Sequence, residues 1–173
     1  MRSFVNLNVF FVFALFFCLN KADATSLTLV SGDSTICLEL SGKVTALNND
    51  DENHVVKIEL IYYNKVVDSL FVKSGKKFKM YLTKNAYYTL KISKVGYIEK
   101  IITVCTELKK FDPNEDFYKF YFDTELIPAI ANEILNQDAL EFPIAIIAFD
   151  EKLGGFFINE HYTTNIKRQS FNK

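Results

Sequence analysis

The chain has 173 residues, of which 49% are hydrophobic, and its 20 basic and 21 acidic side chains give a net charge of −1. This length corresponds to one domain with at most a small extension. So much apolar sequence excludes wholesale disorder, and the six glycines and three prolines exclude collagen-like and low-complexity classes. A nearly neutral chain has no overall positive field to hold nucleic acid, so we expect no nucleic-acid partner.

Residues 1–24 have the three parts of a secretory signal peptide. A basic second residue precedes an uninterrupted apolar run over residues 9–19, and Ala22 and Ala24 are small residues where signal peptidase cleaves. We therefore expect the mature chain to start at Thr25. The predicted destination is outside the cytoplasm: the periplasm, the cell envelope or the medium.

Two other interpretations of residues 1–24, a membrane anchor and a lipoprotein, fit the sequence less well than a cleaved signal peptide. A membrane anchor is disfavoured because the apolar run is shorter than the roughly 20 residues of a spanning helix. A lipoprotein acylated at Cys18 is disfavoured because Phe17 stands where a small residue is required. We expect no transmembrane segment to remain after cleavage.

After a short N-terminal segment, 25–34, hydrophobic residues alternate with polar ones across residues 35–108, which is typical of strands with one buried face. The expected inward positions of the six runs are Ile36, Leu38, Leu40 and Val44; Val56, Ile58, Leu60 and Tyr62; Val66, Leu70 and Val72; Phe78, Met80 and Leu82; Tyr88, Leu90 and Ile92; and Ile98, Ile102 and Val104. Turn residues separate the runs. This spacing predicts a mainly β domain, with two antiparallel sheets packed face to face as a β-sandwich.

The remaining residues, 109–173, are predicted to form a small α+β extension. Its expected elements are strands over 117–126, 142–150 and 156–158, a short helix within 127–140 and a terminal helix over 161–169. A separate subdomain of this size would have a marginal core. We therefore expect the extension to pack on the sandwich, with a hairpin between its last two strands.

Four stretches of the sandwich region resemble carboxypeptidase-regulatory-like domains. They are SGKVT at 41–45, VKIEL at 56–60, FKM at 78–80 and, most specifically, YYTLKISKVGY at 87–97, which is similar to Y-x-L-x-v-s-k-x-G-Y. The resemblance covers Leu38 to about Leu108. It implies a prealbumin-like or Ig-like sandwich, found in exported envelope proteins of Bacteroidetes-type bacteria, with no active-site residues. Two departures concern the first loop, where an acidic-amide run replaces the usual Pro and Gly, and the spacing before Phe78.

Two cysteines remain in the mature chain, Cys37 and Cys105. An even pair in an exported protein is compatible with a disulfide. Each lies in an apolar, strand-like context, so two buried free thiols are the alternative.

The sequence offers little chemistry. His54 and His161 are more than a hundred residues apart, outside any ligand-spaced cluster. The carboxylates at 50–52 allow a weak Ca²⁺ site, but a solvated loop explains them better because adjacent loop residues rarely converge on one ion. Nucleophile and phosphate-binding motifs are absent. We therefore predict no catalytic residues, no metal and no cofactor, and we do not expect an enzyme.

Two groups of surface residues remain as candidates for binding. Four lysines, Lys73, Lys76, Lys77 and Lys79, surround one turn and suit either an anionic glycan or lipid head group or the protection of a sheet edge. Tyr63, Tyr81 and Tyr121 are expected on the outward positions of their strands, where aromatic rings bind sugars or a partner protein. Because the extension is itself aromatic, we expect it to cover this tyrosine row.

The function predicted from the sequence is that of a non-catalytic, exported structural or protein-interaction module. Its partner would be an envelope protein, held by an exposed sheet face or edge. The alternative is a carbohydrate-binding module that uses the tyrosine face to hold a glycan. An enzyme would instead require polar residues converging in a deep pocket.

Overall fold

A computed structural model describes residues 35–48, 55–109, 117–129 and 141–171, without the side chains of the last two, and these residues belong to one compact unit. The expected signal peptide at 1–24, the segment 25–34, the carboxylates at 50–52 and His54 lie outside the described residues. So does most of the helix expected within 127–140.

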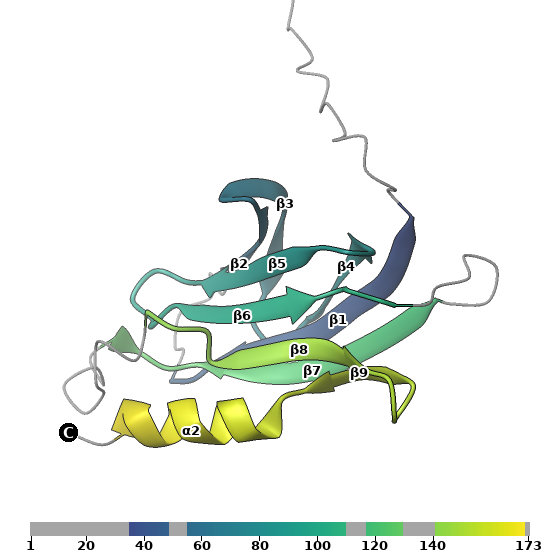
Figure 1. The fold of residues 1–173 in the computed structure, drawn as a ribbon. Coiled ribbons are helices and arrows are strands. Elements are labelled where there is room, and N and C mark those ends of the chain that lie inside the picture. Colours follow the sequence, from purple (N-terminus) through teal and green to yellow (C-terminus); the bar gives the residue numbers. More distant parts are fainter. Residues whose placement is uncertain (1–34, 49–54, 110–116, 130–140, 172–173) are drawn as a thin grey trace, which may run out of the picture. The chain divides into compact units, whose positions relative to one another are not determined.

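The described residues form two sheets and one helix (Figure 1). The elements in chain order are β1 (Ile36–Ala46), β2 (Val55–Tyr62), β3 (Lys65–Lys73), β4 (Lys77–Thr83), β5 (Tyr87–Ser93), β6 (Lys100–Cys105), β7 (Tyr118–Leu126), β8 (Ala145–Asp150), β9 (Gly155–Ile158) and α2 (Glu160–Phe171). One sheet has three strands in the order β4-β1-β7, and the other has six in the order β3-β2-β5-β6-β8-β9.

The alternating pattern of the sequence is what packs the sheets together. In β4, for example, Phe78, Met80 and Leu82 are buried while the two residues between them are exposed. Inward residues of both sheets join one hydrophobic core. The predicted mainly β sandwich with a small C-terminal extension is confirmed.

The extension contributes strands to both sheets. β7 pairs with β1, and β8 pairs with β6, and both pairings are parallel, in contrast to the antiparallel pairing within the first sandwich strands. Parallel neighbours require long connections, which the extension's position late in the chain provides. The expected β8–β9 hairpin is present, and the Asp150 carboxylate accepts the backbone N–H of Lys152 at 2.8 Å in its turn.

β1 is the central strand of the three-stranded sheet, and Gly42 allows its two neighbours to approach it. A Cβ at this position would lie 2.5 Å from the Phe122 carbonyl oxygen and 2.9 Å from the Phe78 ring. The rings of Phe78 and Phe122, whose centroids are 5.8 Å apart, meet edge to face beside the glycine. The missing side chain is therefore replaced by aromatic packing.

Two expected core positions were wrong. Ile36 is 48% exposed because an irregularity in β1 buries the neighbouring Cys37 instead. Val66 is 53% exposed because β3 is an edge strand whose register with β2 shifts between Leu60 and Ile61. The alternation of hydrophobic and polar residues locates the strands correctly, but at a bulge it no longer predicts which residues point into the core.

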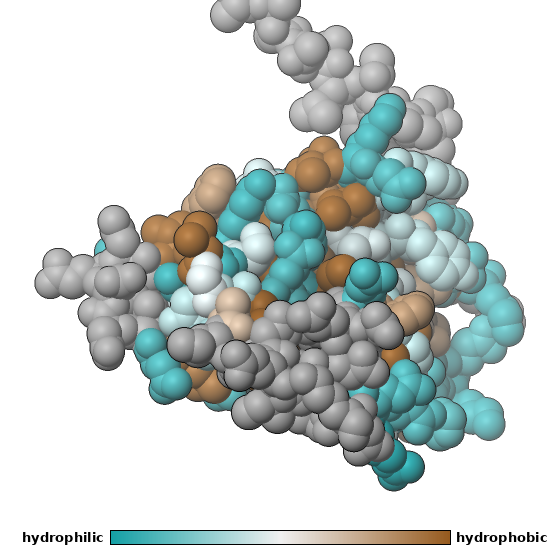
Figure 2. Space-filling model, turned by 90° about the vertical axis from the view of Figure 1, so that its left-hand side faces the viewer, coloured by the Kyte–Doolittle hydropathy of each residue, from teal (hydrophilic) through white to brown (hydrophobic). Residues whose placement is uncertain are grey.

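Viewed from the left-hand side of Figure 1, the surface mixes hydrophobic patches with hydrophilic ones (Figure 2). Within the described part of the chain, no helix is both long and apolar enough to cross a membrane.

Candidate functional site

The outer side of the three-stranded sheet carries two of the three predicted tyrosines. Tyr81 on β4 is opposite Glu39 of β1, and Tyr121 on β7 is opposite Ser41 of β1. Tyr81 is 51% exposed and Tyr121 is 46% exposed. We call this surface the tyrosine–lysine face, and its residues are Glu39, Ser41, Lys43, Lys77, Lys79, Tyr81, Lys119, Tyr121 and Asp123.

Lysines and tyrosines interact on this face. Lys77 Nζ lies 5.5 Å from the centre of the Tyr121 ring and Lys79 Nζ lies 6.0 Å from that of Tyr81, which is within cation–π range. Lys79 also forms a 3.0 Å ion pair with Glu39, and this hydrogen bond raises the pKa of Lys79. Lys79 is therefore held near the Tyr81 ring in its charged form.

Tyr121 also has a carboxylate partner. A hydrogen bond to Asp123 raises the pKa of the Tyr121 phenol above its usual range. Tyr121 and Asp123 occupy successive outward positions of β7, so the phenol and the carboxylate are neighbours on this face.

Tyr63 does not belong to this face. It lies in the turn between β2 and β3, in the six-stranded sheet, where Tyr63 and Asn64 have φ values of 46° and 60°. Two consecutive left-handed residues in a two-residue hairpin form a type I′ turn. Tyr63 is 79% exposed and packs edge-on against Tyr62. The expectation that all three tyrosines share one outward strand surface is therefore wrong.

The expected cover over the tyrosine row is also absent among the described residues. The extension supplies β7 as an edge strand beside β1, so it widens the sheet and contributes Tyr121 to the face. An edge-on addition leaves the outer side of a sheet open, which is why both rings keep about half of their exposure.

A second exposed surface is the edge strand β3. Phe71 and Val66 are 68% and 53% exposed, and β3 pairs on one side only, with β2. Unpaired backbone groups on such an edge are available to an added strand. Lys65 and Lys73 stand at the two ends of β3, where charge opposes unwanted strand pairing.

Cys37 and Cys105 are free cysteines in the structure, and only the first of them is buried. Cys37 is buried in the core, and burial raises the pKa of its thiol to about 11. Cys105 is half-buried and alternates with the fully buried Val104 and Thr106, so it faces the outer side of the six-stranded sheet. A bridge would have to pass through that sheet.

The remaining candidate, His161, is exposed in the first turn of α2, with Nδ1 3.4 Å from the Asn165 side chain. Among the described residues, no three His, Cys, Asp or Glu side chains are grouped so as to hold a metal ion.

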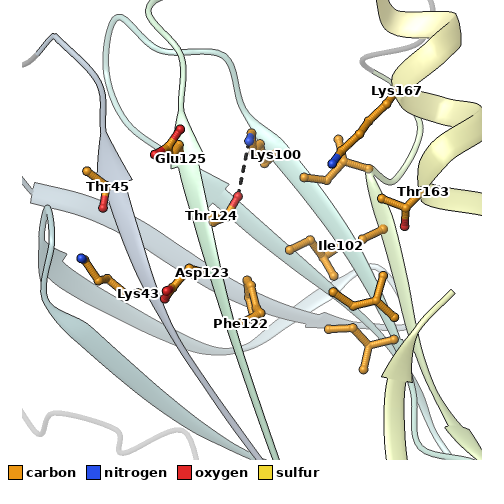
Figure 3. Close-up of a pocket in the computed structure, with 14 residues that line it drawn as sticks. Lys43, Thr45, Lys100, Ile102, Phe122, Asp123, Thr124, Glu125, Thr163 and Lys167 are labelled. Atoms are coloured by element: carbon orange, nitrogen blue, oxygen red, sulfur yellow. Dashed lines mark hydrogen bonds between the residues drawn. The ribbon is translucent and has the colours of Figure 1, made fainter. Parts of the chain in front are cut away.

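The structure also contains a cavity of about 470 Å³ that the sequence did not indicate (Figure 3). It lies at the open side of the sandwich, between β1 and β7 of one sheet and β6, β8 and β9 of the other, with α2 alongside. Asn159 caps α2 by accepting the Tyr162 N–H at 3.0 Å, and the Tyr162 hydroxyl donates to the Pro143 carbonyl at 2.8 Å. These two bonds hold the helix beside the cavity.

Lys100 is the functional candidate that sequence reasoning missed. It is half-buried on the inward side of β6, on the same side as Ile102 and Val104, and its Nζ donates to Thr124 Oγ1 at 3.3 Å. Burial lowers the pKa of the Lys100 ammonium, and nearby Lys167 lowers it further while Glu125 raises it. A lysine at an inward strand position was the signal available in the sequence.

Comparisons with known proteins identify no family. No family model matches the chain, and no curated protein matches it. Among solved structures it is similar to the crystal structure of S.CueP, with 13% sequence identity, a TM-score of 0.35 and coverage of 51% of this chain. The chain spans 60% of that protein's length. A TM-score of this size does not establish a shared fold.

Proposed function

We propose that this chain is an exported, non-catalytic β-sandwich module of the bacterial cell envelope that binds a partner protein through the tyrosine–lysine face. The observation that supports it is the position of Tyr81 and Tyr121, both about half exposed, on the same side of one sheet. Tyrosine is enriched at protein interfaces and among the residues that dominate binding energy, because it combines a large apolar ring with a polar end.

The charges of the face indicate the partner's chemistry. Lys79 is paired with Glu39, whereas Lys77 and Lys119 have no carboxylate within ion-pair distance among the described residues. A partner that places carboxylates over these two lysines and an apolar group between the rings would match the face. Such pairing chiefly sets the association rate and the choice of partner.

Export is the part of this proposal that rests on the sequence at 1–24 and on the resemblance to carboxypeptidase-regulatory-like domains. It is tested by expressing the full chain in a Gram-negative host and measuring, by mass spectrometry, the intact mass of the protein recovered from the periplasm. We expect loss of the first 24 residues and a chain that begins at Thr25. Unprocessed protein that stays in the cytoplasm would contradict export.

Binding is tested by capture from detergent-solubilised envelope of the source cells. The variant Y81A/Y121A removes both rings of the face, and Y63A removes an even more exposed tyrosine that lies on the other sheet. We expect a specific protein to be retained by the wild type and by Y63A and to be lost by Y81A/Y121A. Loss with Y63A or F71A alone would place the interface on the β3 edge instead.

Carbohydrate binding is the second candidate, and the Tyr121–Asp123 pair is the observation that favours it. An exposed ring beside a carboxylate acceptor is suited to the apolar face and hydroxyl groups of a sugar. This candidate predicts that soluble glycans bind the wild type and that Y121A lowers their affinity. It also predicts that the capture experiment retains no specific protein.

A further inference from the structure

The cavity beside α2 has apolar walls. They come from β6, β7, β8, the residue preceding β8, and β9, and consist of Ile102, Phe122, Ile144, Ala145, Ile147 and Ile158. Its volume of about 470 Å³ falls within the roughly 300–1,000 Å³ of small-molecule sites. Aliphatic and aromatic walls of this kind favour a hydrocarbon group.

Cationic and hydroxyl groups stand at one end of this apolar space. Lys100 and Thr124 approach each other from β6 and β7, and Lys167 and Thr163 face the cavity from successive turns of α2 (Figure 3). The spacing of four residues places Thr163 and Lys167 on the same side of the helix. Two ammonium groups and two hydroxyls therefore line the same end of the cavity.

Neither lysine forms an ion pair with a carboxylate of the described residues, although Glu125 is near enough to raise the pKa of Lys100. The lining carboxylates, Asp123 and Glu125, alternate with the inward Phe122 and Thr124 on β7. Asp123 lies beside Lys43, and Glu125 lies at the level of Thr45 (Figure 3). Lys100 has a neutral hydroxyl as its bonded partner. A partly buried cation without a direct ion-pair partner is costly, and a bound anion would offset that cost.

From this geometry we infer that the cavity binds a monocarboxylate with a hydrocarbon tail, its carboxylate held by Lys100 and Lys167 and its tail lying against Ile102 and Ile147. A monoanion fits better than a phosphate dianion because only one of the two ammonium groups, that of Lys100, is withdrawn from water. Lys43 and Asp123 of the tyrosine–lysine face also line this cavity. Carboxylate binding by Lys100 and Lys167 does not depend on the partner-binding role proposed for that face, and either can fail without the other.

The test is calorimetric titration of the processed full chain with decanoate. Decanol, which has the same tail without the charge, and acetate, which has the charge without the tail, are the matched ligand controls. We expect decanoate to bind and decanol to bind roughly ten- to a hundredfold more weakly, the value of a hydrogen bond to a charged group. Acetate should not bind measurably. Equal affinity for decanol, or stronger binding of decyl phosphate, would overturn the assignment.

Variants locate the site. K100M keeps the length of the side chain without its charge, and K167E reverses the charge on the exposed side of α2, where folding is least affected. Both variants should lower the affinity for decanoate by about tenfold or more. K77M, which removes a lysine from the tyrosine–lysine face, should leave that affinity unchanged. Unchanged affinity in both K100M and K167E would overturn the proposal, and a K100M that fails to fold leaves K167E to decide it.

Discussion

Lys79 and Lys100 are both strand lysines, yet the structure places them in opposite environments. Lys79 lies on the outer side of β4, pairs with Glu39 at 3.0 Å and keeps its contact with water. Lys100 lies on the inner side of β6, and its bonded partner is the neutral hydroxyl of Thr124 at 3.3 Å. The pKa of Lys79 is raised by its carboxylate, whereas that of Lys100 is lowered by burial.

This difference separates two kinds of surface chemistry. The charged groups of the tyrosine–lysine face are exposed to water, and Lys79 already has an ion pair with Glu39, so a partner there exchanges exposed contacts for others. The cavity holds a cation, Lys100, whose burial is only partly offset by the nearby Glu125. An anionic ligand in the cavity would supply the negative charge that Lys100 lacks. Whether a strand lysine points inward or outward therefore decides whether it is suited to hold a buried anion or an exposed partner.

The largest expected effect comes from breaking the support that both regions share. Gly42→Ala would place a Cβ 2.5 Å from the Phe122 carbonyl, a backbone atom that cannot turn aside. We expect a loss of roughly 1–3 kcal/mol in the free energy of unfolding, as for other overpacked sites. Urea denaturation measures it.

The matched control is Gly155→Ala, because a Cβ there would meet only the Phe157 ring, at an ordinary 3.4 Å. We expect its unfolding midpoint to stay close to that of the wild type. If Gly42→Ala is tolerated equally well, β7 is not held against β1 as closely as the structure has it.

The next effect sharpens the comparison directly. Lys100→Met replaces a partly buried cation by an apolar side chain of similar length, so the ligand-free protein should gain about 1 kcal/mol in unfolding free energy at pH 7. Because the folded pKa of Lys100 is lowered, the unfolded chain holds more protons between that pKa and the ordinary value of 10.5. Wild-type stability should therefore rise relative to Lys100→Met through this window.

Urea unfolding of both proteins at pH 7 and pH 10 measures this gap. It should be widest at neutral pH and narrower at pH 10. A Lys100→Met protein that is less stable than the wild type at pH 7 would show that the ammonium is a structural group, and would remove the reason for an anionic ligand.

Much of the fold could be predicted from the sequence because each sandwich strand has one apolar side. The runs ending at Leu82 and Ile92 were located by alternation alone. What could not be predicted was pairing: the register of β7 beside β1 depends on contacts between residues about eighty positions apart. The irregularity between Ile36 and Leu38 is likewise seen only in the pairing of β1 with β4, and alternation within β1 does not reveal it.

The candidate sites were predicted less well, for the same reason. Tyr81 and Tyr121 were correctly placed on outward positions, but only the order β4-β1-β7 brings them to one face. Tyr63 was assigned to a strand because its alternation continues into the turn. Lys100 went unnoticed although it interrupts an inward apolar series, and its cavity exists only because β7 and α2 close around it.

The smallest effect completes the comparison, and it is expected from Lys79→Met. This is the same substitution as at Lys100, made on the side of the sandwich where the lysine remains in water. An exposed ion pair such as Lys79–Glu39 contributes little, since water and salt screen it, so the urea midpoint should not change measurably. Decanoate affinity should also be unchanged, because Lys79 does not line the cavity. A shift as large as that of Lys100→Met would mean that the side of the strand does not decide what these lysines do, and the contrast between the two regions would be lost.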